Sequence, residues 1–140
     1  MYVTIFTAGK NNILVKSLSL TTDDRDDILK GRKLNDRVIN AAQTMMKRQF
    51  PDQKGLQDTV VLEGAQAWDD VPQRFTQIVF DRSRKHWVCV SNKFTDGIVE
   101  VYDSLPTKTF AVSKSVMRQV ATILKTQENS FKLRSVKNTI

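Results

Sequence analysis

The chain has 140 residues, of which 40% are hydrophobic and 26% are charged, and it carries a formal net charge of +7. These values indicate one globular domain and argue against a disordered chain. A single cysteine and a single histidine exclude an internal disulfide and a structural zinc site of the usual Cys/His kind, and no apolar run approaches the ~20 residues that span a bilayer. We therefore expect no metal, no other cofactor and no membrane partner, and an intracellular location in the nucleus or the cytoplasm.

The N-terminal part of the chain is predicted to be extended. Short strands are expected at 2–6 and 13–15, on either side of a turn rich in glycine and asparagine. We expect a single domain over 1–140, with 1–16 as an N-terminal extension to it.

Two helices are predicted next. The first is capped by Thr21 or Thr22, carries acidic residues in its first turn, and ends at Gly31, which suits the left-handed backbone after a last turn. The second is capped by Asn35 and ends at Pro51. Its apolar residues recur at helical spacing: Val38, Ile39, Ala42, Met45 and Met46.

The second half of the chain is predicted to be mainly β. Strands are expected at 59–62, 75–80, 86–91 and 98–102, and a last extended segment at 131–136. Between them, a helix starts at about Ser113. Its apolar stripe is predicted to be Met117, Val120, Ala121 and Leu124. Helices, then a strand meander, then a helix and a strand indicate an α+β fold.

His86 and Asp103 are the candidate catalytic pair. His86 opens one predicted strand and Asp103 follows the end of the next, so a hairpin would bring the two side by side. A carboxylate held against an imidazole fixes its tautomer and stabilises its protonated form, as a general base beside a nucleophile requires. The alternative is a surface histidine and an acid that caps a turn.

Three blocks of sequence resemble one family. The blocks are His86-Trp87, Tyr102-Asp103-Ser104-Leu105 and Leu34-Asn35-Asp36. They are similar to motifs of the ubiquitin-like-protein proteases, cysteine peptidases that process SUMO-type, NEDD8-type and related modifiers. The resemblance covers roughly 17–136. It departs from the family at Lys33, where the family often has tryptophan. It implies a papain-like fold of the ubiquitin-like protease type, with N-terminal helices and a mainly antiparallel sheet, incomplete at the C-terminal end.

The resemblance also implies roles for four residues. His86 would be the general base and Asp103 its orienting partner. Trp87 would lie over the narrow channel that admits the Gly-Gly tail of the modifier, because only glycine leaves room for so close an approach. Asp36 would contact a basic patch on the modifier. The alternatives are core packing for Trp87 and an acid that complements the helix dipole for Asp36.

The nucleophile of the family is absent from the chain. In the family it lies in an Asp-Cys-Gly block several tens of residues after the acid, and no such block is present. Cys89 follows His86 by three residues, about 10 Å along a strand and on the opposite face, so we interpret it as a buried small hydrophobe. The chain is therefore expected to be truncated and catalytically inactive. Without the helix that bears the nucleophile, one sheet face should expose apolar side chains: Val88, Val90 and Val99 or Val101.

Three functions remain open. The first is a cysteine-type peptidase or isopeptidase that acts on ubiquitin-like modifiers or their conjugates, represented by a chain without its nucleophile. The second is a pseudo-protease that binds a ubiquitin-like protein without cleaving it. The third, ranked last, is a basic nucleic-acid-binding domain, because seven Lys and Arg residues stand against one Glu after Pro106.

Overall fold

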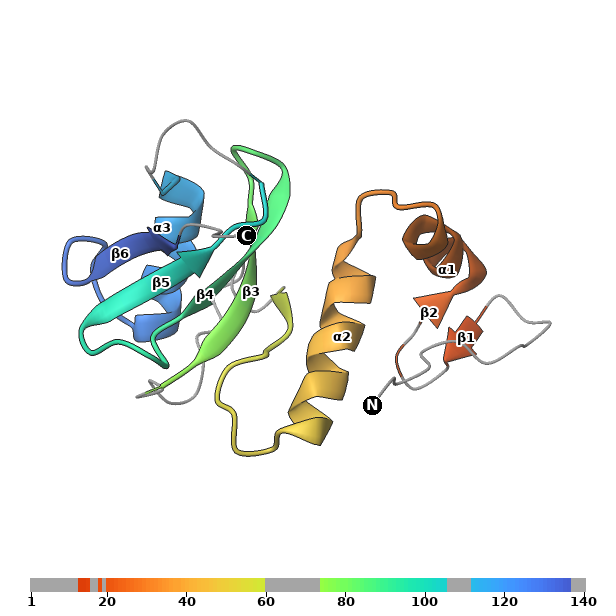
Figure 1. Ribbon diagram of the computed structural model, residues 1–140, viewed down its shortest axis with the longest axis horizontal. Helices are drawn as coiled ribbons and strands as arrows, with labels where there is room; N and C mark the ends of the chain where they lie inside the picture. The colour runs from red at the N-terminus through yellow and green to blue at the C-terminus, as the bar shows by residue number, and fades with distance from the viewer. Residues whose placement is uncertain (1–12, 16–17, 19, 60–73, 106–111, 137–140) are drawn as a thin grey trace.

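The computed structural model describes residues 13–15, 18, 20–59, 74–105 and 112–136 (Figure 1). Its elements are β1 (Ile13–Val15), β2 (Leu20–Thr21), α1 (Thr22–Leu29), α2 (Asp36–Gln49), β3 (Thr76–Asp81), β4 (His86–Ser91), β5 (Ile98–Tyr102), α3 (Lys114–Leu124) and β6 (Lys132–Val136). The predicted α+β fold is confirmed. The strand predicted at 2–6, and that at 59–62 apart from Thr59, lie outside the described residues. No helix in the described ranges is both long and apolar enough to cross a bilayer.

The four-stranded sheet has the order β3-β4-β5-β6. β3, β4 and β5 form an antiparallel meander, in which Asp81 pairs with His86 and Cys89 pairs with Tyr102. β6 runs parallel to β5, so the chain crosses from one strand to the other through α3. This meander places the start of β4 and the end of β5 at the same end of the sheet.

α3 covers one face of the sheet and forms the main core with it. The buried members of this core are Phe75, Val79, Val88, Val90, Val99, Val101, Val116, Val120 and Ile123. The buried residues of α3 are Val116, Val120, Ala121 and Ile123, whereas Met117 and Leu124 of the predicted stripe are only half-buried. The prediction is thus confirmed for Val120 and Ala121, and Val116 and Ile123 take the places predicted for Met117 and Leu124.

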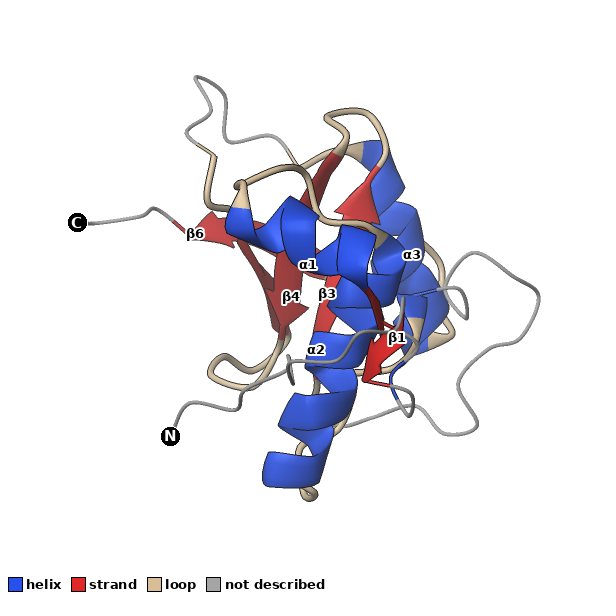
Figure 2. Ribbon diagram, turned by 90° about the vertical axis from the view of Figure 1, so that its right-hand side faces the viewer, coloured by secondary structure: helices blue, strands red, loops and turns tan. Residues whose placement is uncertain are grey.

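The expectation that Val88, Val90 and Val99 or Val101 would be exposed was wrong. All four are buried, because α3 packs on the face that they share. The other face carries the half-buried side chains: Ile78, Phe80, Trp87, Cys89 and Tyr102. Figure 2, viewed from the side of α1 and α2, shows these two helices in front of the sheet. Because its side chains are half-buried and those that face α3 are buried, the face opposite α3 is the less covered one.

The N-terminal elements form a second, smaller core. Leu20, Val38 and Ala41 are buried there between β2 and α2. α1 begins at the N-cap Thr21, whose hydroxyl accepts from the backbone of Asp24 while the Asp24 carboxylate accepts from the Thr21 N–H, a reciprocal capping box. Gly31 has a φ of +65° just after the helix, as predicted for its C-terminal end.

The edge of β3 that faces away from β4 is covered by the segment that follows α2. The N–H of Leu56 donates to the carbonyl of Thr76 at 2.9 Å, and the N–H of Thr76 donates to the carbonyl of Lys54 at 3.0 Å. Gly55 lies at this crossing with a φ of +92°. The backbone of Gly55 approaches Thr76 so closely that a side chain has no room there.

Two buried glutamines join α2 to this edge. The Gln43 carbonyl oxygen accepts from the N–H of Ile78 at 3.1 Å and from the Gln77 amide at 3.0 Å, and the Gln43 amide donates to the carbonyl of Gln57 at 2.8 Å. The Gln77 carbonyl oxygen accepts from the N–H of Gln57 at 2.7 Å. Gln43 and Gln77 are 1% and 0% exposed. The buried face of α2 therefore includes the polar residue Gln43, which the predicted apolar stripe did not contain.

Candidate functional site

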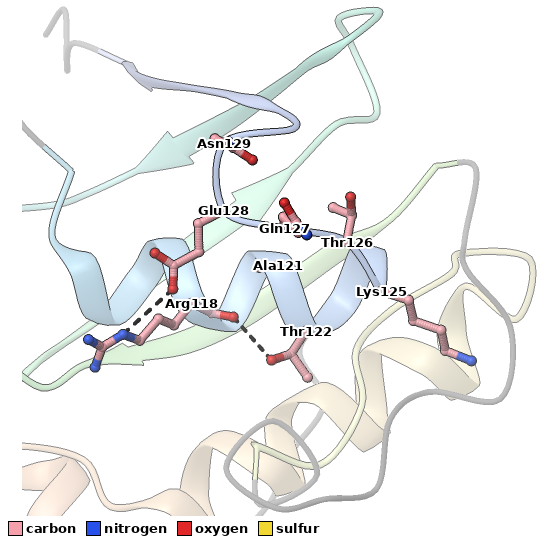
Figure 3. A pocket seen from close by; sticks show the side chains of 8 residues that line it. All are labelled: Arg118, Ala121, Thr122, Lys125, Thr126, Gln127, Glu128 and Asn129. Atoms are coloured by element: carbon pink, nitrogen blue, oxygen red, sulfur yellow. Dashed lines mark hydrogen bonds and ion pairs between the residues drawn. The ribbon is translucent and has the colours of Figure 1, made fainter.

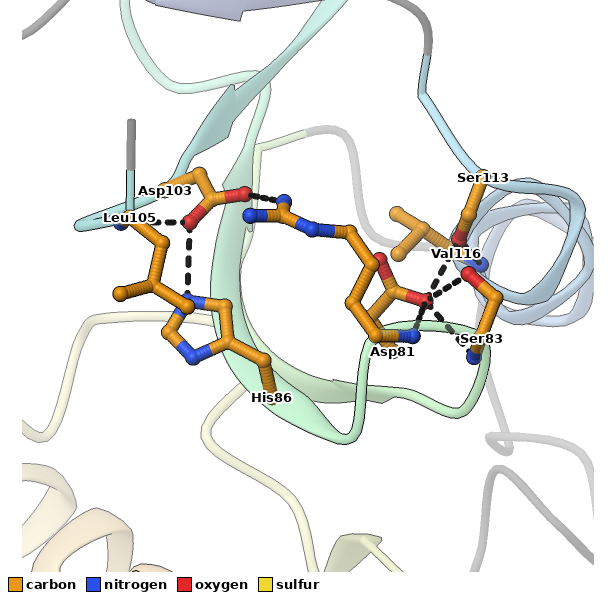
Figure 4. Close-up of polar contacts among 8 residues, drawn as sticks. Asp81, Ser83, His86, Asp103, Leu105, Ser113 and Val116 are labelled. Carbon is orange, nitrogen blue, oxygen red and sulfur yellow. Dashed lines mark hydrogen bonds and ion pairs between the residues drawn. The ribbon is translucent and has the colours of Figure 1, made fainter. Parts of the chain in front are cut away.

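His86 and Asp103 meet at the end of the sheet where β4 begins and β5 has just ended. The Nε2 atom of His86 lies 2.8 Å from Oδ1 of Asp103 (Figure 4). The pair is largely shielded, because the imidazole is 17% exposed and the carboxylate 11%. The predicted contact between the two side chains is confirmed; their catalytic role stays a prediction.

The Asp103 carboxylate accepts hydrogen bonds from three sides. Oδ1 also accepts from the N–H of Leu105 at 2.9 Å, and Oδ2 accepts from the guanidinium of Arg84. Burial alone would raise the pKa of Asp103, but the Leu105 N–H, Arg84 and His86 together hold that pKa below its ordinary value. Asp103 is thus ionised at neutral pH, and a neutral His86 must donate from Nε2, which leaves Nδ1 as the basic nitrogen.

The turn between β3 and β4 supplies Arg84, a residue that the sequence did not single out. Asp81 organises this turn: its Oδ1 accepts from the hydroxyl of Ser83 at 2.7 Å and from the N–H of Arg84 at 3.4 Å. The same oxygen accepts from the hydroxyl of Ser113, the N-cap of α3, at 2.9 Å (Figure 4). A chain of polar contacts therefore leads from the start of α3 to the candidate pair.

Trp87 joins the sheet to the start of α2. Its indole N–H donates to the carbonyl of Leu34 at 2.8 Å, and its ring lies 4.8 Å from that of Phe80, centroid to centroid. The side chain is half-buried, so part of the indole is open to solvent. The packing alternative accounts for these contacts, while the predicted place over a channel stays a prediction.

Asp36 is exposed in the first turn of α2, where it complements the helix dipole. The buried acid in this region is Asp24 instead. Its carboxylate accepts from the Asn35 amide at 2.8 Å and from both Nη2 and Nε of Arg37, at 3.0 and 3.3 Å. Burial opposes its ionisation, yet the bonds from Arg37, Asn35 and Thr21 lower the pKa of Asp24 from the usual 3.8 to about 2. Asp24 thus fixes the start of α2 relative to α1.

Cys89 does not fit the role of a nucleophile. It lies three residues beyond His86 in β4, about 10 Å along an extended strand. It is half-buried rather than fully buried as expected, and burial raises the pKa of its thiol, so that the thiol stays protonated at neutral pH. Among the described residues, no three His, Cys, Asp or Glu side chains are grouped so that they could hold a metal ion.

A wide, open groove lies at the C-terminal end of α3, away from the candidate pair (Figure 3). Arg118 and Glu128 line it and form an ion pair with a 3.6 Å distance between Nε and Oε1. On β6, Arg134 likewise pairs with Glu100 at 2.9 Å. Two of the cations behind the nucleic-acid alternative are therefore already paired with acids; that alternative stays a prediction.

The contact between His86 and Asp103 predicts a tautomer. We expect neutral His86 to carry its proton on Nε2 in the native protein, and the Asp103→Asn variant to populate the form protonated on Nδ1, because an amide can donate to Nε2 instead of accepting. Nitrogen-15 NMR of the ring measures this directly, since His86 is the one histidine in the sequence. Asp96→Asn is the control, because that side chain is 90% exposed. A native ring protonated on Nδ1 would contradict the assignment.

No protein-family model and no curated protein sequence matches the chain. Solved structures do match. The chain is similar to a SUMO protease Ulp1 with its catalytic cysteine oxidised to a sulfonic acid, at a TM-score of 0.63 and 17% identity over 92% of this chain and 68% of that one. The sulfinic acid form matches over the same shares at 0.62 and 15%. At these identities the similarity establishes a Ulp-like protease fold and not membership of the family.

Proposed function

We propose that His86 and Asp103 are the general base and its orienting acid in a cysteine-peptidase site for ubiquitin-like modifiers. We further propose that the 140 residues by themselves bind such a modifier without cleaving it. The observation that carries the proposal is the 2.8 Å contact between Nε2 and Oδ1, because it leaves Nδ1 of the imidazole free to accept a proton from a thiol. The fold shared with SUMO proteases supports SUMO as the first modifier to test.

The proposed binding surface includes Trp87 and Asp36. The indole of Trp87, the residue that follows His86, is held on two sides by the Leu34 carbonyl and the Phe80 ring. It therefore offers a rigid apolar surface. A flat wall of this kind suits an extended glycine tail, which has no side chains to keep it at a distance. Asp36 is exposed and can pair with a basic side chain of the modifier.

Binding of purified SUMO tests the proposal. We expect titration calorimetry to give measurable affinity for SUMO with its Gly-Gly tail and much weaker affinity for SUMO without the tail. Asp36→Lys should weaken binding about tenfold, because it replaces an attractive charge by a repulsive one. Asp23→Lys is the matched control, since Asp23 is also an exposed acid in the first turn of a helix. Equal affinity for both forms of SUMO would contradict the role of the tail.

A turnover assay separates binding from catalysis. We expect no cleavage of a fluorogenic SUMO substrate by the 140-residue chain, because its one cysteine is Cys89, with a raised thiol pKa and no reach to His86. Cys89→Ala should leave this result unchanged. Cleavage that Cys89→Ala abolishes would overturn the proposal that this chain binds without cleaving.

A further inference from the structure

We propose that Arg84 is a positioning residue for the candidate pair, which fixes the Asp103 carboxylate so that Oδ1 faces His86. This inference rests on the proposed role of the pair. The guanidinium of Arg84 bonds to Oδ2 of Asp103, while Oδ1 accepts from His86 and from the N–H of Leu105. The two oxygens of the carboxylate are thus divided between a cation and an imidazole.

Arg84 is itself held in place by the turn that carries it. Its backbone N–H donates to Asp81, which is 2% exposed and also accepts from the N-cap of α3. The next residue, Lys85, has a φ of +51°, a left-handed conformation that only a defined turn imposes on a side chain of this size. The Arg84 side chain is 30% exposed, so the guanidinium reaches Asp103 from a partly shielded position.

A fixed carboxylate matters because its torsion is otherwise soft. The terminal torsion of an aspartate has a broad, two-fold profile, so a carboxylate held on one side only rotates readily. The planar guanidinium restricts that rotation in a way that a point charge does not. Among the described residues, the charged groups near Asp103 include Arg84, His86 and, across a cavity of about 20 Å³, Asp81. A cavity of this size holds about one water, so little solvent fits between Asp81 and Asp103.

The test uses NMR of the folded chain and needs no substrate. In Arg84→Met, we expect the pKa of Asp103 to rise towards its ordinary value, because the cation on Oδ2 is gone. The chemical shift of the Asp103 carboxyl carbon, followed against pH, measures this pKa. We also expect the Nε2 proton of His86 to exchange with water about tenfold faster or more, as loss of a charge-assisted bond allows the pair to open more often. Arg82→Met is the matched control, since it removes the same charge from the same turn.

Arg84→Lys separates charge from geometry. It should keep the pKa of Asp103 lower than Arg84→Met does, yet still speed the exchange of the Nε2 proton, because lysine places a freely rotating ammonium where arginine places a planar guanidinium. Unchanged pKa and exchange in Arg84→Met would overturn the proposal. If that variant does not fold, unchanged exchange in Arg84→Lys overturns it. Failure of SUMO to bind would instead count against the proposed function, because these NMR readouts do not involve the modifier.

Discussion

Replacing Gly55 by alanine should destabilise the fold by about 3 kcal/mol or more, the upper range for a side chain forced into filled space. A Cβ at this position would lie 2.0 Å from the carbonyl oxygen of Thr76 and 2.9 Å from its carbonyl carbon. Both atoms belong to the β3 backbone and cannot move aside alone. Relief of the clash would separate the segment 54–57 from β3 and break the bonds of Gln43 and Gln77 there.

Urea unfolding followed by circular dichroism measures this loss. Gly31→Ala is the matched control, because Gly31 also has a positive φ, +65°, but an added Cβ would meet no atom within 4 Å. The control should cost about 1 kcal/mol, the usual penalty for a left-handed residue other than glycine. Equal losses in the two variants would show that the close approach to Thr76 contributes nothing beyond the backbone conformation.

The carboxylate of Asp24 should stabilise the fold at neutral pH by about 2 kcal/mol, the value that corresponds to a pKa lowered from 3.8 to about 2. A lowered pKa in the folded state means that this contribution is complete above about pH 4. It is lost as the pH falls towards 2, when Asp24 takes up a proton. Asp24→Asn should therefore be less stable than the native chain by this amount at pH 7, and the difference should shrink at low pH.

Thermal unfolding at pH 7 and at about pH 2 checks the prediction. Asp23→Asn is the control, because Asp23 is exposed in the same first turn and makes only the weak interaction of an acid with a helix dipole, about 0.5 kcal/mol. A loss in Asp24→Asn that is equal at both pH values would contradict an electrostatic origin. Such a result would mean that the fit of the side chain against Arg37 and Asn35, and not its charge, stabilises the fold.

Local signals in the sequence predicted the elements well and their buried faces less well. Caps such as Thr21, Asn35 and Ser113 act within one helical turn, so the helix starts were found where the side chains accept. The buried face of a helix depends on its partner. Val116 and Ile123 are buried because α3 lies across valines of β4 and β5, and no pattern within the helix specifies that crossing.

Gln43 illustrates the same limit for α2. A helical pattern of apolar residues does not predict an inward glutamine, because the partners of Gln43 lie far away in the sequence. They are backbone groups of Gln57 and Ile78 and the side-chain amide of Gln77. The contact of His86 with Asp103 was predictable because one hairpin brings them together. Arg84 was not, since its direction depends on the turn that Asp81 organises.

The two edges of the four-stranded sheet differ in how open they are to self-association. β3 is covered by the segment after α2, whereas β6 is bonded on one side only within the described part of the chain. Lys132 and Arg134 alternate along β6 and are both exposed. Although Arg134 also pairs with Glu100, lysine and arginine side chains on an open strand discourage a second copy from pairing with it. Concentrated protein should therefore stay dispersed at low salt, and neutral residues at these two positions should expose β6 as a site of edge-to-edge aggregation.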